Sequence, residues 1–306
     1  MRIFLTGVSG YFGGLLAETL ARVSEVEGIT GIDVTEPATD LPTKVDFVQM
    51  DIRSPKVEAA MAGHEVVVHT AFIVLWFAKM PATVRDDINL NGVQNMARAA
   101  AANEVQRFVH ASSTAVYDVD LLRGQSDTDE NAALGKGDSF SYYCNGKAMA
   151  ERTLSEVLGS TGTVLTFLRP TYVLGPRNRA TVDSMRETAV NIRGRDPRIQ
   201  YVHEDDVAAA FQQAVLADMP GAYNVVPDDF IRLSEAWQIL GLDSVRTVPA
   251  WAARLAAVVQ WRFFGSQTHP SWVSLMMSDA TVSNAKLRAT GWVPSCGSAD
   301  ALRSAL

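Results

Sequence analysis

The segment SYYCNGK at 141–147 holds the side chains of this chain that are best suited to acid–base chemistry. On a helix, residues three or four positions apart share a face, so Tyr143 and Lys147 lie together while Tyr142 points elsewhere. A free phenol titrates at about pH 10 and is a weak base at neutral pH, but a neighbouring ammonium group favours its phenolate form. The spacing predicts Tyr143 as a proton carrier activated by Lys147; the alternative is a solvated pair without chemistry.

A second segment, TGVSGYFG, predicts a phosphate-binding loop. Gly7, Gly10 and Gly13 come directly after an expected strand and open an expected helix, so bare backbone amides and the helix N-terminus can hold a pyrophosphate. Asp33 follows twenty residues after Gly13, where a carboxylate binds ribose hydroxyls and repels the extra phosphate of NADP. No Arg or Lys follows Asp33 closely, so NAD is favoured over NADP. The alternative is a tight turn followed by an acid that only ends a strand.

Composition excludes several classes of function. The chain has 306 residues, 47% of them hydrophobic, and a net charge of −7, which argues against a nucleic-acid partner. Its two cysteines are too few for a disulfide framework, and we expect no metal site. The apolar stretch 66–78 is shorter than the roughly 18 residues that span a bilayer. We expect a soluble, cytoplasmic protein without a membrane partner.

The elements that must position these residues alternate between strands and helices. Expected strands at 2–6, 29–34, 45–50, 66–71, 107–112 and 164–170 are separated by helical segments that include 12–22, 83–103 and 142–158. This order predicts an α/β fold, a Rossmann-type doubly wound parallel sheet. Further helices are expected at 181–192, 205–217, 232–240, 249–262 and 297–305, with short strands near 200–203 and 222–226. We therefore expect a dinucleotide-binding domain at 1–174 and a smaller, mostly helical substrate lobe at 175–306, interleaved with the last sheet strands.

Together, these motifs resemble the extended short-chain dehydrogenase/reductase family, the NAD-dependent epimerase/dehydratase group. The resemblance rests on the glycine loop, the Tyr143–Lys147 pair and the segment ASSTAVY upstream of it, and it runs through nearly the whole chain. Further matching segments are NLNGVQN at 89–95, LRPTYVLGP at 168–176, YVHEDDVAAA at 201–210 and AYNV at 222–225.

The resemblance implies roles for particular residues and a homodimer formed through the helices at 83–103 and 142–158. It implies that Ser113 orients the substrate, with Tyr143 as acid/base and Lys147 as its activator and a ribose ligand. A plain strand-end serine is the alternative for Ser113. The implied cofactor-binding residues are Gly7, Ser9, Gly10, Tyr11, Phe12, Gly13, Asp33, Asp51, Ile52, Thr70, Ala71, Asn89, Tyr143, Lys147 and Pro170.

Departures from the family pattern narrow the expected reaction. Thr114 and Ala115 stand where sugar 4,6-dehydratases carry an Asp-Glu pair, and the connection from Pro176 to His203 is short for a nucleotide-sugar site. Asp118 replaces the usual glycine. The aromatic segment FIVLWFAKM at 72–80 follows the fourth strand, where Phe72, Trp76 and Phe77 either line the substrate side or simply cover the sheet.

We therefore expect an NAD-dependent oxidoreductase that interconverts a secondary alcohol and a ketone on a small or apolar substrate. An epimerase that oxidises a nucleotide sugar transiently with tightly bound NAD is the first alternative. A dinucleotide-binding sensor or structural subunit without chemistry is the second. Intact Ser113, Tyr143 and Lys147 count against that last alternative.

Overall fold

A seven-stranded parallel sheet forms the centre of the computed structural model, which describes residues 1–74, 79–117, 128–135, 141–265, 269–271, 273, 277–279 and 281–306. Its strand order is β11-β6-β5-β4-β1-β2-β3. The strands are β1 (Arg2–Thr6), β2 (Gly28–Asp33), β3 (Val45–Gln49), β4 (Val66–His69), β5 (Arg107–Ala111), β6 (Val164–Pro170) and β11 (Gly221–Val225). The predicted Rossmann-type fold is confirmed.

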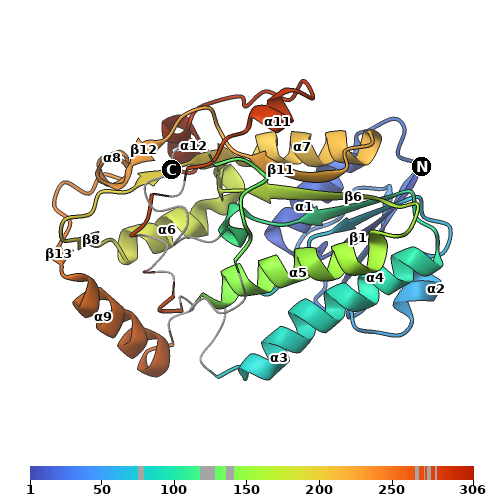
Figure 1. The fold of residues 1–306 in the computed structure, drawn as a ribbon, viewed down its shortest axis with the longest axis horizontal. Coiled ribbons are helices and arrows are strands. Elements are labelled where there is room, and N and C mark those ends of the chain that lie inside the picture. The colour runs from blue at the N-terminus through green and yellow to red at the C-terminus, as the bar shows by residue number, and fades with distance from the viewer. Residues whose placement is uncertain are drawn as a thin grey trace.

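Helices cover both faces of the sheet and bury two separate apolar layers (Figure 1). One layer packs α1 (Tyr11–Ala21) and α7 (Glu204–Leu216) against the sheet through residues such as Leu16 and Phe211. The other layer contains α2 (Val57–Met61), α4 (Gly92–Ala102) and α5 (Tyr142–Leu158), with Met96 and Leu154 at its centre. The central strands are buried on both sides, which explains their continuous apolar runs.

The sheet reverses its strand order between β1 and β4, and this reversal places the ligand crevice. Strands β2 and β3 lie on one side of β1, while β4, β5 and β6 continue on the other. The helices that follow β1 and β4 therefore leave the sheet on opposite faces, and a crevice opens at the carboxyl ends of these strands. Gly7 follows β1 directly, and Thr70 follows β4.

The lobe beyond β6 is built mainly from short elements around its own core. It contains α6 (Arg179–Glu187), α8 (Leu233–Ile239), α9 (Ala250–Phe263), α11 (Ala285–Arg288) and α12 (Ser298–Ser304). Its short strands are β7 (Tyr172–Leu174), β8 (Asn191–Ile192), β9 (Arg198–Ile199), β10 (Tyr201–His203), β12 (Ile231–Arg232) and β13 (Thr247–Val248). The helix expected over 181–192 ends earlier, at Glu187, because the next residues pair with β13 as strand β8.

The helix expected over 83–103 is also divided. It consists of α3 (Ala82–Asp86), a π-helical turn (Asp87–Asn91) and α4. The turn contains Asn89, whose side chain bonds both backbone groups of Ile73, at 2.7 Å to its N–H and 3.2 Å to its carbonyl. A π-helical turn in a helix is a frequent sign of a functional site, and here it aims one polar side chain at the segment after β4.

A buried ion pair lies behind the carboxyl ends of β5 and β6. Arg169 on β6 and Glu151 on α5 are almost fully buried and are joined by two hydrogen bonds of 2.6 and 2.9 Å. The Ser112 hydroxyl donates to Glu151 at 2.5 Å, and Arg169 donates to the Tyr117 hydroxyl at 2.8 Å. The Tyr117 hydroxyl in turn donates to Asn224 of β11 at 2.6 Å. The network thereby connects α5 with three parallel strands.

Replacing one member of this ion pair should be far more harmful than replacing a surface partner. Arg169→Met leaves the Glu151 charge buried and unpaired, so we expect the free energy of unfolding to fall by about 3–5 kcal/mol. The matched control is Arg303→Met, because Arg303 pairs with Asp300 at the surface and such pairs contribute about 0–1 kcal/mol. Urea unfolding of both variants measures the difference. Equal losses would contradict the role given to the buried pair.

Candidate active site

The glycine loop is too tight for side chains at two of its positions. Gly7 has a φ of +74°, and a Cβ there would lie 2.9 Å from the Ala71 nitrogen. A Cβ on Gly13 would lie only 1.9 Å from the Gly7 carbonyl oxygen, because helix α1 packs directly against the loop. The N–H of Gly10 donates to that same carbonyl at 3.0 Å. The loop therefore exposes bare backbone at the beginning of α1.

Asp33 lies beside this loop at the end of β2. Its carboxylate accepts the Ser9 N–H at 3.2 Å and the Thr35 N–H at 3.1 Å. The Ser9 hydroxyl donates to the Thr35 carbonyl at 2.6 Å, which ties the glycine loop to the chain that follows β2. An acid is therefore held next to the phosphate loop, as dinucleotide binding requires.

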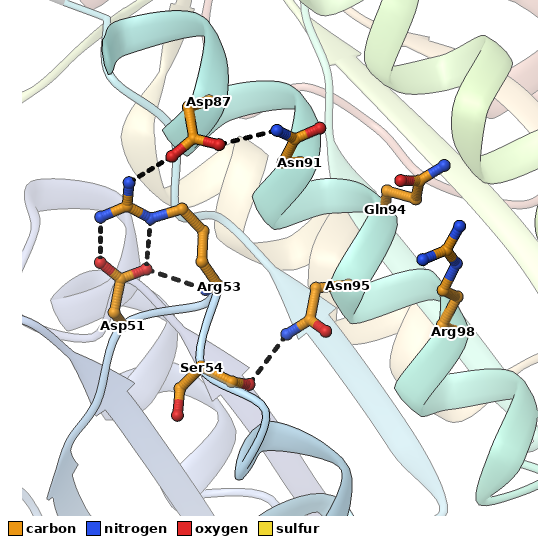
Figure 2. Close-up of a pocket in the computed structure, with 8 residues that line it drawn as sticks. All are labelled: Asp51, Arg53, Ser54, Asp87, Asn91, Gln94, Asn95 and Arg98. Atoms are coloured by element: carbon orange, nitrogen blue, oxygen red, sulfur yellow. Dashed lines mark hydrogen bonds and ion pairs between the residues drawn. The ribbon is translucent and has the colours of Figure 1, made fainter.

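The strand end at Asp51 carries an ion-pair network and a polar cavity. Arg53 donates to both oxygens of Asp51, at 3.0 and 2.6 Å, and these bonds lower the pKa of Asp51. Arg53 also donates to Asp87 at 2.5 Å. Figure 2 shows Arg53 between the two carboxylates, on the wall of a cavity of about 540 Å³. Ile52 is buried against α4, where a Cβ on Gly92 would lie 2.4 Å from it. Of the two predicted cofactor residues Asp51 and Ile52, only Asp51 lines the cavity.

Tyr143 and Lys147 share one face of α5. Both contact Phe72, whose ring meets the Tyr143 ring edge-on at 6.0 Å and lies 4.0 Å from the Lys147 Nζ. Tyr142 faces elsewhere: its hydroxyl donates to the Val74 carbonyl, and the Arg85 guanidinium lies 4.8 Å from its ring centroid. Tyr143 is therefore the tyrosine that can act together with Lys147.

Ser113 completes this face from the end of β5. It begins the 3-10 turn Thr114–Val116, where its hydroxyl oxygen accepts the Ala115 N–H at 3.1 Å and leaves the hydroxyl proton available. The Ser113 side chain also hydrogen-bonds Tyr143. Burial raises the pKa of Tyr143 to about 12, against the opposing effect of that hydrogen bond. Ser113 and Tyr143 can therefore hold one substrate oxygen between them.

Lys147 is buried above two neutral histidines. Its Nζ donates to the Ala111 carbonyl at 2.6 Å, and burial lowers its pKa to about 7 against the attraction of Glu151. His69 and His110 stack beneath it with ring centroids 5.4 Å apart. Burial lowers the pKa of His69 to about 3 and that of His110 well below its usual value, and the Lys147 charge lowers both further. Both rings are therefore neutral at neutral pH.

The structure places the remaining predicted cofactor residues around the crevice in different ways. Thr70 donates to the Thr6 carbonyl at 2.6 Å, and Ala71 abuts Gly7, so both lie at the loop. Phe12 turns its ring toward Phe211 of α7, at 6.3 Å, which leaves only its backbone at the loop. Pro170 ends β6 beside β11, while Asn89 reaches the segment after β4.

A contact between the beginning of α1 and the beginning of α7 could not be foreseen from the sequence. The Tyr11 hydroxyl donates to the buried carboxylate of Glu204, at the beginning of α7, at 2.5 Å. Burial and Glu204 raise the pKa of Tyr11 well above its usual range. Arg177 pairs with Glu204 at 3.6 Å and with Glu18 at 2.8 Å, so it binds protein carboxylates. The acidic segment HEDD at 203–206 was the available signal in the sequence, but it did not indicate that Glu204 binds Tyr11.

The crevice fits a dinucleotide. Side chains at Gly7 or Gly13 would fill the cradle at the beginning of α1, which carries no acid in its first turn to repel a phosphate. Asp33 lies at the carboxyl end of β2 beside the loop, in the position typical of an acid that binds ribose hydroxyls, and Lys147 donates to the Ala111 carbonyl at the carboxyl end of β5. The backbone cradle, the acid and the lysine together match the donor set that NAD requires.

Three of the residues considered above lie outside the described part of the chain, and that part contains neither a metal-binding cluster nor a membrane-spanning helix. No group of three His, Cys, Asp or Glu side chains that could hold a metal occurs within the described ranges. In the same part of the chain, no helix is both long and apolar enough to cross a membrane. Trp76, Phe77 and Asp118 lie outside the described residues.

Comparison with known protein families identifies the family of this chain. The model of the NAD dependent epimerase/dehydratase family matches residues 3–225, which is more than half of the chain. The chain therefore belongs to that family of NAD-dependent enzymes, as the glycine loop and the Tyr143–Lys147 face indicate.

Two relatives and one solved structure illustrate the range of similarity. Short-chain dehydrogenase/reductase family 42E member 1 of Xenopus laevis is 29% identical over 226 residues, 68% of this chain and 56% of that protein. The 3 beta-hydroxysteroid dehydrogenase type 7 of Mus musculus is 32% identical over 153 residues, 46% of this chain and 40% of that protein. The chain spans less than two thirds of the length of these curated relatives. UDP-glucuronic acid 4-epimerase from Bacillus cereus in complex with NAD has the same fold, with a TM-score of 0.75 at 17% identity, covering 99% of this chain and 97% of that one.

The buried lysine predicts how stability depends on pH. The pKa of Lys147 is about 7 in the folded protein and about 10.4 in the unfolded chain. Between these values only the unfolded state keeps the proton, so the free energy of unfolding rises with pH, by roughly 1 kcal/mol per unit. Below about pH 7 both states are protonated and the contribution is flat.

The measurement is urea unfolding of the wild type and Lys147→Met from pH 7 to pH 9. We expect the wild-type value to rise relative to the variant across this interval. Lys56→Met, which removes an exposed lysine, is the control for loss of one positive charge. A wild-type-minus-Lys147→Met difference that does not change with pH would contradict the burial of a lysine with a lowered pKa.

Proposed function

We propose that this protein is an NAD-dependent oxidoreductase that interconverts a secondary alcohol and a ketone on a small or apolar substrate. The observation that supports this most directly is the shared face of Tyr143, Lys147 and Phe72, next to the Ser113 hydroxyl. In this proposal, bound NAD supplies a hydride acceptor, and NADH a donor, at the nicotinamide ring.

The chain's own residues manage the proton. During oxidation the substrate hydroxyl gives its proton to the Tyr143 phenolate, and the phenol returns it in the reverse direction. Ser113 holds the substrate oxygen beside the phenol. Burial disfavours both the phenolate and the ammonium, so hydrogen bonds from Lys147 to ribose hydroxyls would favour its charged form again. The positive charge of Lys147 would then lower the pKa of Tyr143, so that its phenolate forms more readily near neutral pH.

The preference for a small or apolar substrate rests on three observations. Phe72 presents an aromatic ring at the catalytic face. Of the arginines that could clamp a diphosphate, Arg177 pairs with two carboxylates and Arg179 donates to the carbonyl of Leu306. The mouse relative is named for a hydroxysteroid, a large apolar alcohol.

The positions of Thr114 and Ala115 provide no acid or base for a dehydratase reaction.

An epimerase remains the second candidate because the Bacillus cereus protein of the same fold acts on UDP-glucuronic acid. Arg193 and Arg195 follow β8 and are exposed, so the lobe still offers guanidinium groups for a diphosphate. An epimerase uses the same Tyr143 chemistry but retains its NAD, whereas a dehydrogenase releases stoichiometric NADH.

The two adjacent tyrosines give the sharpest test of the catalytic assignment. Tyr143→Phe removes the proton carrier and should lower kcat by at least a hundredfold while leaving NAD affinity nearly intact. Tyr142→Phe removes the bond to the Val74 carbonyl and should lower stability by about 1 kcal/mol with little effect on kcat. Steady-state kinetics and thermal unfolding of both variants measure this. Comparable losses of kcat would refute the assignment of Tyr143.

The substrate class is tested by parallel assays on the NAD-loaded protein. Calorimetric titration with UDP, dTDP and GDP should detect no binding, because Arg177 and Arg179 already bind acceptors of the protein. A panel of hydrophobic secondary alcohols and ketones should give turnover, followed by NADH absorbance. Tight binding of one nucleotide diphosphate, without turnover across the panel, would favour the epimerase instead.

We further propose a cytoplasmic homodimer that pairs through α4 and α5. These helices pack side by side on one outer layer (Figure 1), and Met149 of α5 is exposed there. Sedimentation velocity that detected only a monomer at all concentrations would contradict the dimer.

A further inference from the structure

Helix α9 turns a row of large apolar side chains toward solvent. Trp251 is 70% exposed, Phe263 is 75% exposed, and Phe264, directly after the helix, is 79% exposed. These three side chains alone present roughly 400 Å² of apolar surface, comparable with the largest apolar patch on a typical soluble monomer. The other exposed large apolar residues of the helix are Leu255, Val258 and Val259. We call these six residues the α9 apolar face.

The opposite side of α9 is held by the protein. Ala253 is buried, and Trp261 packs edge-on against His269 with ring centroids 4.9 Å apart. His269 in turn meets the Tyr142 ring at 5.2 Å, next to the catalytic tyrosine. Figure 1 shows α9 at the end of the molecule away from α2. The α9 apolar face therefore belongs to a helix with a fixed orientation relative to the active site.

The charge around α9 is opposite in sign to that of the whole chain. The sequence from 244 to 278 contains no Asp or Glu but includes Arg246, Arg254 and Arg262, while the chain carries a net charge of −7. Arg262 is exposed and lies on the same side of the helix as Leu255 and Trp251, about two and three helical turns after them. The region is thus both apolar and locally basic.

We propose that α9 docks on an anionic lipid surface, lying in the plane of the membrane interface. A helix of 14 residues is about 21 Å long, which is too short to cross a hydrocarbon core of about 30 Å. Tryptophan and phenylalanine favour the boundary between headgroups and acyl chains, and arginines attract anionic headgroups. Apolar area and positive charge together provide two membrane-binding signals on one helix.

A second copy of this chain fits the face less well. A two-fold pairing through α9 would set the same surface against itself, so the arginines of one copy would meet those of the other. Such like-charge contacts are unfavourable, whereas an anionic bilayer complements them. The expectation of no membrane partner was based on the absence of a spanning segment from the sequence, and an interfacial helix does not need one. The docking is independent of the proposed reaction.

The test is co-sedimentation of the full chain with vesicles of phosphatidylcholine alone and of phosphatidylcholine mixed with phosphatidylserine. We expect binding to the mixed vesicles, weakened at raised ionic strength. The triple variant Trp251→Ser, Phe263→Ser and Phe264→Ser should bind more than tenfold more weakly, and Arg262→Glu should lose binding on the mixed vesicles. Because the replaced side chains are exposed, thermal unfolding should stay close to wild type.

Matched controls and a second readout separate docking from general stickiness. Val293→Ser and Phe230→Ser remove exposed apolar side chains elsewhere and should leave vesicle binding unchanged. If the triple variant unfolds, the single variant Phe264→Ser carries the comparison. Failure of the wild type to bind either vesicle, or undiminished binding of the α9 variants, would overturn the proposal. A lipid-free dimer that the triple variant abolishes, without vesicle binding, would assign the face to a second copy.

Discussion

The buried ion pair between Glu151 and Arg169 holds the elements of the proposed catalytic site in one arrangement. Removing two charges from water is costly, and the cost is offset only when the geometry is good and the remaining bonding capacity is used. Here Ser112 and Tyr117 complete the bonding. Ser112 adjoins the proposed catalytic serine, and Glu151 lies one helical turn beyond Lys147 on α5. Through the bond from Ser112, this ion pair fixes the end of β5, which carries Ser113, relative to α5, which carries Tyr143 and Lys147.

The same burial that makes this pair costly keeps the neighbouring titratable groups neutral. It raises the pKa of Tyr143, and it lowers those of Lys147 and His69. The cofactor-free site therefore disfavours both the phenolate and the ammonium that the proposed chemistry needs. Charge becomes favourable only when a ligand offers hydrogen bonds that replace water, which couples proton transfer to occupancy of the crevice. A solvated Tyr–Lys pair on a surface helix would lack this coupling.

The sequence could predict those structural features that are determined within a short segment of the chain. The steric requirement at Gly13, the acid at Asp33 and the alternation of strands and helices are properties of short segments, so the Rossmann-type fold followed from them. The partnership of Glu151 with Arg169 joins a helix to a strand, and although Arg169 stands in the segment LRPTYVLGP, nothing in that segment or around Glu151 identifies the partner. Likewise, the helix expected over 181–192 is cut short by pairing of β8 with β13, which lies far along the chain. Long-range pairing of this kind overrides local helical preference and leaves no local signal.

The catalytic face and the substrate side are built by different means. Lys147 is buried and is fixed by a hydrogen bond to the Ala111 carbonyl, at the carboxyl end of the interior strand β5. The substrate side is assembled from ring contacts: Phe72 against the catalytic face, and Tyr142, His269 and Trp261 in sequence toward α9. Ring contacts constrain distance but impose less direction than buried hydrogen bonds. If the proposed function holds, we expect that Tyr142, His269 and Trp261 can be exchanged to alter substrate choice at less cost to the geometry of proton transfer, because the buried bonds of Lys147, Glu151 and Arg169 set that geometry and these three rings do not take part in them.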